Sequence, residues 1–502
     1  MPCWLWRCDL LTSHPYCISM QRGGRVSFNR TFPVHNHMVA ENDNPVIACI
    51  TSLGCAKNLV DAEVMCGTMA ANGIVLANDP EDADVYIVNT CGFIQSARDE
   101  AEEHIRAALK WKKAGRRRGY DRRVIVSGCL AQRSAPEYAK KFPAVDCFIG
   151  IDEVPRIHEV VKRLFEVEPQ PDQGCEPEIQ VGQAEPHYLY DDVSPRIQTT
   201  PASYAYVKIA EGCNHRCAFC AIPGIRGRLR SRSMESVLQE CRQLLENGVK
   251  ELDLIAQDTT AYGYDLPQRP SLTGLLRKID ELPGDFWIRV LYTHPVHITD
   301  EFIDFLATGR HAVPYLDIPL QHISDPVLRG MRRAINGEKT RAMMNGIRAK
   351  YPQIMIRTTF LTGFPGETEA MHEELMDFVR SFGFDRLGAF AFSPEPGTPA
   401  CEISEGTVPQ ALAEKWRGEL LDLQKDISLE RNQRLVGRRI RVLLEERRGK
   451  RLYAGRSTGD APEVDQTVMV RVPAGRNLPA LNSFAEVEIK TAGSYDLGAI
   501  LK

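Results

Sequence analysis

The sequence predicts an α/β protein built from three folded parts in series. Between residues 44 and 165, apolar β-branched runs alternate with helical segments, which indicates a parallel sheet flanked by helices. Between residues 199 and 434, six strand-like runs are separated by helix-length segments, which indicates a partial parallel barrel of the (β/α)6 type. In residues 435–502, short alternating segments separated by turn residues indicate a small antiparallel β-barrel.

Length and composition are compatible with a multidomain enzyme. A chain of 502 residues can bury two or three separate cores. The formal charge of -4 neither requires nor excludes a nucleic-acid partner. Fifteen cysteines without a convincing signal peptide favour a reducing, cytoplasmic compartment. No apolar stretch approaches the roughly 20 residues that cross a bilayer.

Two segments lack the pattern of a folded domain. Residues 1–43 show neither helical nor strand periodicity, so we expect a disordered extension or a start codon placed too early, with Met38 as the real start. A transit peptide is the alternative, because acidic residues are few there. Residues 166–198 are rich in proline, glutamate, glutamine and aspartate, and this composition predicts an exposed linker.

Each of three strand-like runs in the first part ends in a cysteine. The runs are PVIACITSLGC, DVYIVNTC and RVIVSGC, and they end at Cys55, Cys91 and Cys129. Since the carboxyl ends of parallel strands open on a shared crevice, we expect the three thiols to converge on a metal site. The adjacent Gly54, Gly92 and Gly128 would let the backbone approach a bulky inorganic group. Three unrelated buried cysteines are the alternative.

Three further cysteines lie within eight residues, in the stretch EGCNHRCAFC. Cys213, Cys217 and Cys220 follow the first strand-like run of the predicted barrel. Structural zinc is the alternative, but zinc sites of that kind are closed and four-coordinate, and no second cysteine pair follows. His215 lies between the cysteines, where a ligand would crowd them. Three soft thiolates and an open position favour a 4Fe-4S cluster.

The cysteine loop and its surroundings resemble a known family. CNHRCAFC is similar to the CxxxCxxC loop of radical S-adenosylmethionine (radical SAM) enzymes, and AIPGIRGRLRSR resembles the next segment of their methylthiotransferase branch. The order of the three parts resembles the methylthiotransferases over nearly all of residues 45–502, with a TRAM domain last. SLGCAKNLVDAE, PLQHISDPVLRGMRR and GRSTGDAPEVDQ resemble the RimO branch; the tRNA-modifying branch typically has GCQMN at its first cysteine.

The resemblance implies an activity and its cofactors. The activity is methylthiolation of the β-carbon of an aspartate in small-subunit ribosomal protein S-twelve, with S-adenosylmethionine as radical source and methyl donor. Two 4Fe-4S clusters, each with three cysteine ligands, are implied: one at Cys213, Cys217 and Cys220 for cofactor cleavage, and one at Cys55, Cys91 and Cys129 for sulfur delivery.

Implied partners are S-twelve, or the ribosomal subunit carrying it, and a reduced flavodoxin or ferredoxin. A tRNA adenosine methylthiotransferase and a non-catalytic iron-sulfur protein that binds RNA or senses redox state stay open as alternatives.

The resemblance also suggests contacts to S-adenosylmethionine. Phe219 occupies the place of an aromatic residue near the adenine, and Gln257 ends the second barrel run, where many relatives carry a glycine pair that this chain lacks. Gly363 and Gly366, in TGFPGET, either lie against the adenosyl group or form a tight turn. No catalytic residue is assigned beyond the cluster ligands.

The last part begins with a basic run. Its members are Arg438, Arg439, Arg441, Arg447, Arg448, Lys450 and Arg451. A basic run is most often a solvated face. Its place at the end of an enzyme with two clusters, in a region that resembles the TRAM domain, favours docking of the substrate.

Overall fold

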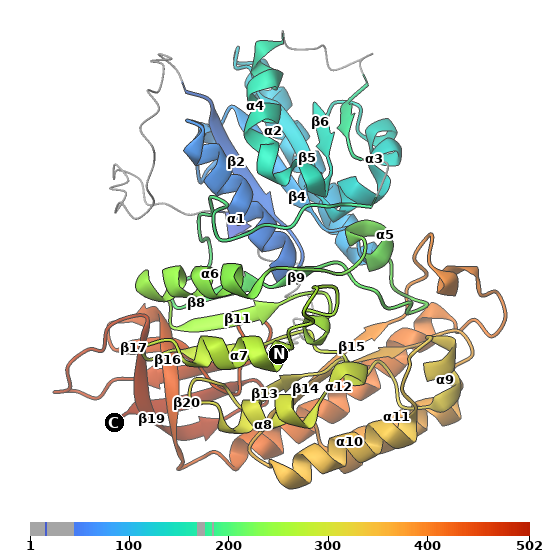
Figure 1. Ribbon diagram of the computed structural model, residues 1–502, viewed down its shortest axis with the longest axis vertical. Coiled ribbons are helices and arrows are strands. Elements are labelled where there is room, and N and C mark those ends of the chain that lie inside the picture. The colour runs from blue at the N-terminus through green and yellow to red at the C-terminus, as the bar shows by residue number, and fades with distance from the viewer. Residues whose placement is uncertain (1–15, 18–44, 168–175, 183–184) are drawn as a thin grey trace, which may run out of the picture. The chain divides into compact units, whose positions relative to one another are not determined.

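The computed structural model describes residues 16–17, 45–167, 176–182 and 185–502. The chain divides into two compact units: Met1–Thr199 with Gly224–Gly227, and Thr200–Pro223 with Arg228–Lys502. Each unit is described by itself below, and Figure 1 labels its elements. The predicted extension, residues 1–43, lies outside the described residues except for Tyr16–Cys17. Among the described helices, none has both the length and the apolar character needed to cross a bilayer.

The first unit contains a seven-stranded sheet. Its strands are β1 (Tyr16–Cys17), β2 (Ile47–Ser52), β3 (Val75–Leu76), β4 (Val85–Thr90), β5 (Arg123–Gly128), β6 (Cys147–Ile149) and β7 (Glu178–Gln180). The order is β1-β2-β4-β5-β6-β7, with β3 beside β2, and every pair is parallel except β1–β2. The three runs that end in cysteines form β2, β4 and β5. β7 lies within the predicted linker and extends the sheet.

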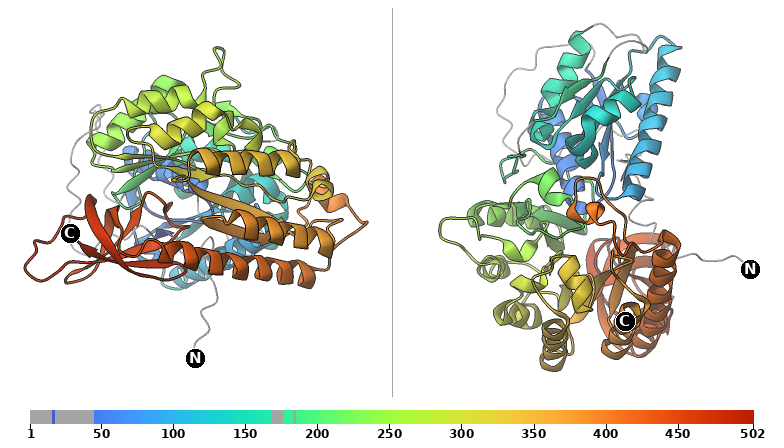
Figure 2. Two further views of the ribbon diagram at one scale, coloured as in Figure 1. Left: turned by 90° about the horizontal axis from the view of Figure 1, so that it is seen from below. Right: turned by 90° about the vertical axis from the view of Figure 1, so that its right-hand side faces the viewer.

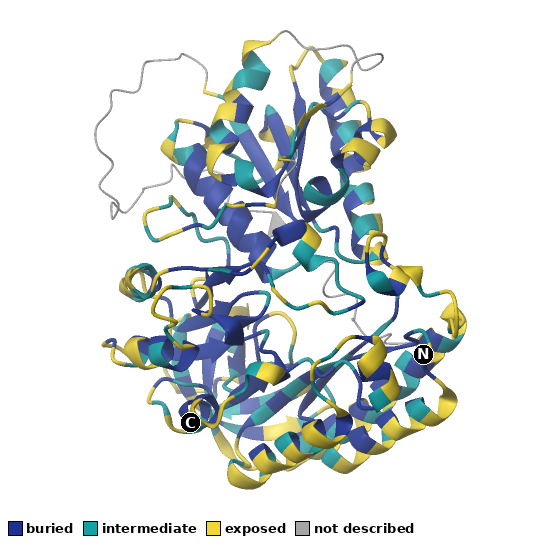
Figure 3. Cartoon of the chain, turned by 45° about the vertical axis from the view of Figure 1, so that its right-hand side comes forward, coloured by how far each residue is buried: buried dark blue, intermediate teal, exposed yellow. Residues whose placement is uncertain are grey.

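Helices cover this sheet because its strands are apolar on both faces. The helices are α1 (Ala56–Ala71), α2 (Gln95–Arg116), α3 (Cys129–Lys141) and α4 (Ile157–Glu166). Residues of α2 and α3 pack on Val88, Val126 and Phe148 in one core, and α1 packs against α4. Burial on both faces is typical of a parallel sheet in an α/β domain. The central strands β4, β5 and β6 are buried along their whole length, as the dark blue strands in Figure 3 show.

The second unit begins with the predicted partial barrel. Its parallel strands are β8 (Tyr204–Lys208), β11 (Glu251–Ile255), β12 (Trp287–Val290), β13 (Tyr315–Asp317), β14 (Met355–Thr362) and β15 (Arg386–Ala391). They form two three-stranded sheets, β8-β11-β12 and β13-β14-β15, with a parallel bridge from Ile288 to Ala312 beside β13. β9 (Ala210–Glu211) and β10 (Arg230–Ser231) form a small antiparallel pair. The six strands are those that the sequence predicts.

Helices separate these strands and begin at residues that suit a helix start. They are α6 (Met234–Glu246), α7 (Leu272–Asp280), α8 (Asp300–Thr308), α9 (Asp325–Gly330), α10 (Gly337–Lys350), α11 (Glu369–Phe382) and α12 (Gln410–Gln433). Ser233, Thr299 and Thr368 accept backbone N–H bonds at the starts of α6, α8 and α11. Except for α9, whose Val327 packs in a separate smaller core, their apolar sides join the strands in one large core. A short helix, α5 (Ile222–Arg226), follows the cysteine loop in sequence, and its residues from Gly224 onward belong to the first unit.

The carboxyl-terminal part is a closed five-stranded barrel, seen beyond α12 in Figure 2. Its strands are β16 (Arg439–Gly449), β17 (Leu452–Ser457), β18 (Thr467–Arg471), β19 (Ser483–Ala492) and β20 (Asp496–Leu501). Four of its pairings are antiparallel, as the sequence predicts, and β18–β20 is parallel. Residues such as Val442, Val470 and Val487 fill its interior.

Buried charges connect this closed barrel to the six-stranded part. Arg456 of β17 lies 2.6 Å from Glu251 of β11, and Arg289 of β12 lies 2.6 Å from the same carboxylate. Burial alone would raise the pKa of Glu251, but the two guanidinium groups outweigh burial and hold this pKa below its usual value. Asp253 has a raised pKa, because it is buried and lies beside Glu251. Glu251 is therefore an anion held by Arg289 and Arg456, and Arg456 also pairs with Glu445.

We expect Arg456→Met to lower the free energy of unfolding by about 3 kcal/mol, because it leaves a buried carboxylate with one partner fewer. Urea unfolding followed by circular dichroism measures the change. Arg448→Met is the matched control, since the Arg448–Glu446 pair is exposed on both sides and such pairs contribute little. Equal losses in both variants would contradict the importance of the buried network.

Candidate functional site

The three cysteines of the first unit lie at one edge of its sheet. Cys55 precedes α1, Cys91 follows β4, and Cys129 begins α3 directly after β5. Because β2, β4 and β5 are parallel neighbours, their carboxyl ends meet at the same edge. The thiols are close enough for Cys129 and Cys55 to raise the pKa of Cys91. We call Cys55, Cys91 and Cys129 the first triad.

Glycines allow the first triad to pack this tightly. Gly54 has a φ of 87°, and a Cβ placed on it would lie 2.7 Å from the Cβ of Cys91. A Cβ on Gly128, at φ 88°, would lie 2.4 Å from the carbonyl oxygen of Thr90. Both positions combine a left-handed backbone with close contact, so a side chain would be excluded on two grounds. Gly54 thus brings the backbone directly against a thiol of the triad.

Burial dominates the electrostatics of the first triad. It raises the pKa of Cys91 and of Cys129, and in Cys129 the positive charge of Arg226 opposes this effect. The Nε and Nη2 atoms of Arg226 lie 3.3 and 3.2 Å from the sulfur of Cys129. A metal ligand must be a thiolate, so metal binding here would release protons.

The cysteine loop of the second unit follows β9. Backbone hydrogen bonds hold it: the N–H of Ala218 donates to Met331 at 3.0 Å, and the N–H of Ala400 donates to Ala218 at 2.8 Å. The N–H of Cys220 donates to the carbonyl of Cys217 at 3.1 Å. The loop therefore has a fixed shape. We call Cys213, Cys217 and Cys220 the second triad.

Burial also raises the pKa of thiols in the second triad. The pKa of Cys213 rises to about 11 and that of Cys220 to about 12, and the charges of neighbouring cysteines add to the effect of burial in each case. Arg333 lies on the other side, with Nη1 3.5 Å from the sulfur of Cys217 and Nη2 donating to the carbonyl of Pro319 at 3.0 Å. Each triad thus has a guanidinium group against one of its sulfurs.

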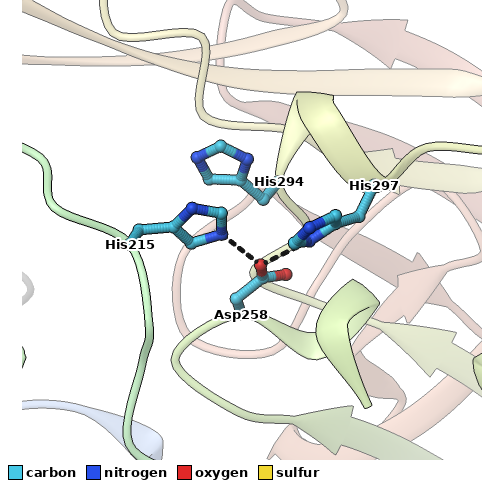
Figure 4. A group of neighbouring side chains, drawn as sticks. All are labelled: His215, Asp258, His294 and His297. Atoms are coloured by element: carbon cyan, nitrogen blue, oxygen red, sulfur yellow. Dashed lines mark hydrogen bonds and ion pairs between the residues drawn. The ribbon is translucent and has the colours of Figure 1, made fainter. Parts of the chain in front are cut away.

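Next to the second triad lies a group of three histidines and an aspartate, shown in Figure 4. The Oδ2 atom of Asp258 is 2.6 Å from Nε2 of His215 and 2.9 Å from Nδ1 of His297. The ring of His294 stacks on that of His215 with centroids 3.8 Å apart. Burial alone would raise the pKa of Asp258, but hydrogen bonds from both imidazoles hold it well below its usual value. Burial, with the charge of Arg333, lowers the pKa of His294 to about 2.

The ligand atoms of these four side chains lie within 4.8 Å of one another, which is compact enough for one metal ion. However, Asp258 already accepts from two imidazoles and from Thr260. We therefore interpret the group as a hydrogen-bonded cluster. A cavity of about 240 Å³ lies beside it, lined by Cys213, Asn214, Tyr264 and members of the cluster.

The residues predicted to contact S-adenosylmethionine lie at strand ends of the second unit. Phe219 is half-buried and packs on the small core around Phe364. Gln257 follows β11, and its Oε1 atom is buried without a hydrogen-bond partner in the described structure. The N–H of Gly363 donates to the carboxylate of Glu367 at 2.6 Å, and this bond closes a tight turn. Gly363 also lies directly against Ala413. Gly366, by contrast, has no atom within 4 Å of the place a Cβ would take.

Three side chains with contacts at these sites were not found from the sequence: Arg226, His297 and Arg333. His297 could have been noticed, because it lies three residues after His294 at the same strand end. Arg226 gives no such signal, since its partner Cys129 is 97 residues away. His322 is fully buried, accepts from the N–H of Ser324 and lies 3.2 Å from Glu367.

Three family models match successive parts of the chain. Residues 48–150 match the Uncharacterized protein family UPF0004, residues 207–379 match the Radical SAM superfamily, and residues 436–501 match the TRAM domain. A "Ribosomal protein uS12 methylthiotransferase RimO" from Desulforamulus reducens is 42% identical over 450 residues, which is 89% of this chain and 98% of the relative. The chain belongs to the RimO family of methylthiotransferases.

Other members of the RimO family match to the same extent. Those from Heliobacterium modesticaldum and Opitutus terrae are each 41% identical, over 89% and 90% of this chain and 93% and 96% of their own length. Among solved structures, the radical S-adenosylmethionine methyltransferase TsrM from Kitasatospora setae is similar with a TM-score of 0.52 at 15% identity, over 71% of this chain and 74% of that one. At that identity the likeness concerns the fold. The protein is thus a radical SAM methylthiotransferase of α/β fold with a TRAM domain.

We expect Gly54→Ala to destabilise the first unit more than Gly73→Ala does. Both glycines have left-handed backbones, at φ 87° and 82°, and this conformation costs an alanine about 1–2 kcal/mol. Only Gly54 would also push a Cβ into Cys91, because the space beside Gly73 is open. Comparing the urea unfolding of the two variants isolates the cost of the contact with Cys91. Equal losses of stability would mean that Cys91 moves aside to accommodate the added methyl group.

Proposed function

We propose that this protein methylthiolates the β-carbon of an aspartate in ribosomal protein uS12. The observation that carries the proposal is the pair of cysteine triads, each at strand ends and each with three thiols, in a member of the RimO family. A β-carbon has no proton that a side-chain base removes easily, so the reaction needs homolytic chemistry and a separate source of sulfur. Two metal centres meet these two needs.

The thiols are suited to two 4Fe-4S clusters. Cys55, Cys91 and Cys129 would hold one cluster, and Cys213, Cys217 and Cys220 would hold the other, each with one iron left open. The donor set is soft, at least partly buried at every position, and free of disulfides in the described structure. When bound, these clusters and S-adenosylmethionine supply the C–H cleavage, the sulfur and the methyl group. The chain holds the thiolates in place and keeps water away from them.

The cavity beside Cys213 supports a site for S-adenosylmethionine. Asp258 lines it with a carboxylate whose pKa is held well below its usual value, and this negative charge would favour a cationic cofactor. Gln257 has a buried oxygen atom without a partner, and the open space beside Gly366 leaves room for a ligand. Phe219 would contribute an aromatic surface. Gly363 would act through the turn that it forms with Glu367.

The closed barrel would dock the ribosomal substrate through part of its basic run. Arg438, Arg439, Arg447, Arg448 and Lys450 are exposed, and exposed cations suit a ribosomal partner. Arg441 is held by Asp285, and Arg451 donates to three backbone carbonyls. The docking surface is therefore smaller than the run. We place the reaction in the cytoplasm, with S-twelve or its ribosomal subunit as substrate and a reduced flavodoxin or ferredoxin as electron donor.

The test is mass spectrometry of ribosomal protein and tRNA from cells that lack this chain and from cells in which it is restored. We expect one aspartate of uS12 to lose its methylthio group in the first cells and regain it in the second, while tRNA nucleosides stay unchanged. A methylthioadenosine that depends on the chain, with uS12 unaffected, would instead show the tRNA activity.

Removing one thiol from each triad should separate the two centres. Cys217→Ala should abolish formation of 5'-deoxyadenosine, and Cys91→Ala should keep that reaction and stop methylthiolation. Each variant should retain about half of the iron of the parent, because one cluster of two remains. Cys401→Ala is the control, since Cys401 is exposed and belongs to neither triad. Undiminished 5'-deoxyadenosine from Cys217→Ala would refute the assignment.

A further inference from the structure

Arg226 makes an unusual set of contacts for a buried cation. Its Nε and Nη2 atoms face the sulfur of Cys129 at 3.3 and 3.2 Å, while Nη1 donates to Asp61 at 2.6 Å and Nη2 to Asn58 at 3.2 Å. Its relative exposure is 1%, and those of Asp61 and Asn58 are 2% and 1%. The guanidinium group is therefore fixed in position: Nη1 contacts the carboxylate of Asp61, and Nε and Nη2 contact the thiol of Cys129.

The position of Arg226 in the chain makes these contacts informative. It ends α5, in the segment that follows the second triad in sequence. Residues 224–227 nevertheless group with the first unit, although the residues on either side of them group with the second. Arg226 is thus a cation of the first unit, although in sequence it lies only six residues after Cys220 of the second triad.

Hydrogen bonds to a ligand sulfur change the properties of an iron-sulfur cluster. A bond from a charged donor is roughly twice as strong as a neutral one, and a buried site of low dielectric strengthens it further. The reduced cluster carries one more negative charge, so bonds to its sulfurs favour reduction and raise the reduction potential. Asp61 offsets part of the charge of Arg226 but leaves its two N–H groups directed at Cys129.

We propose that Arg226 is a positioning residue that hydrogen-bonds the sulfur of Cys129 and raises the reduction potential of the cluster at the first triad. This inference rests on the ligand assignment of the proposed function. It differs from a purely structural ion pair with Asp61, which would affect stability without changing the potential. Arg333 makes a weaker approach to the second triad, with a single nitrogen 3.5 Å from Cys217, and so provides an internal comparison.

Redox titration followed by electron paramagnetic resonance tests the proposal in the full chain. Alanine in place of Cys213, Cys217 and Cys220 leaves the first cluster as the only signal. In this background, the pair Arg226→Met with Asp61→Asn removes a cation and an anion together, so the net charge is kept and the bonds to sulfur are lost. Arg226→Lys keeps the ion pair but loses the two-point contact.

We expect both variants to retain iron and to show a more negative midpoint potential. The double variant should disfavour reduction about tenfold, which is about 59 mV for one electron, and Arg226→Lys should shift less in the same direction. Arg333→Met, in the same background, should leave the potential unchanged.

Unchanged potentials in both Arg226 variants would overturn the proposal, as would an equal shift in Arg333→Met. Loss of iron from both variants would also overturn it, because Arg226 would then be needed to form the site and not to tune it. None of these readings involves uS12. If the potential shifts as expected while uS12 stays unmodified in the assay above, only the proposed substrate fails.

Discussion

The constraint on which the sites depend is the parallel pairing of strands, which brings the carboxyl ends of neighbouring strands to one edge. In the first unit, the strand register determines how close two of the cysteines lie. Thr90 of β4 pairs with Gly128 of β5, and Cys91 and Cys129 are the next residues in the chain. The buried sheet thus provides a rigid support for side chains that are distant in sequence. A loop alone would leave the thiols free to move, at a cost in conformational entropy on binding a cluster.

The sequence predicts the parts of the fold whose pattern is local. β2, β4, β5 and the six strands of the partial barrel are apolar runs of useful length, and each occurs where the sequence places it. β6 and β7 were not predicted, because three residues such as Cys147–Ile149 or Glu178–Gln180 carry no periodicity and become strands only by pairing with a neighbour. β7 also lies in a stretch whose polar composition indicates a linker. The parallel pairing of β20 with β18 is likewise a property of the closed barrel as a whole.

The residues of the candidate sites also divide into those that a local sequence pattern predicts and those that only the folded structure brings together. Cysteine spacing and position at strand ends suffice to group each triad, because these depend on the fold class. Arg226 and His297 depend on how long side chains reach across the folded structure, which no local pattern records. The basic run shows the opposite error: Arg441 and Arg451 contribute to the sequence signal, yet the fold uses both for internal contacts. Charge in a sequence therefore gives an upper bound on charge at a surface.

The two ends of the parallel strands in the six-stranded partial barrel have separate roles. Near their amino ends, Glu251, Tyr315 and Arg386 bind Arg456, Asp465 and Asp460 of the closed barrel. Beyond their carboxyl ends lie the second triad, the histidine cluster and the glycine turn. Hydrophobic contact could hold two barrels together in many orientations, whereas matched buried charges tolerate few, because any mismatch leaves an ion unpaired. We infer that this network of buried charges fixes the orientation of the closed barrel. The network lies at the end of the strands opposite the second triad. The same strands can then carry the closed barrel, with its proposed docking surface, at one end and the proposed radical site at the other.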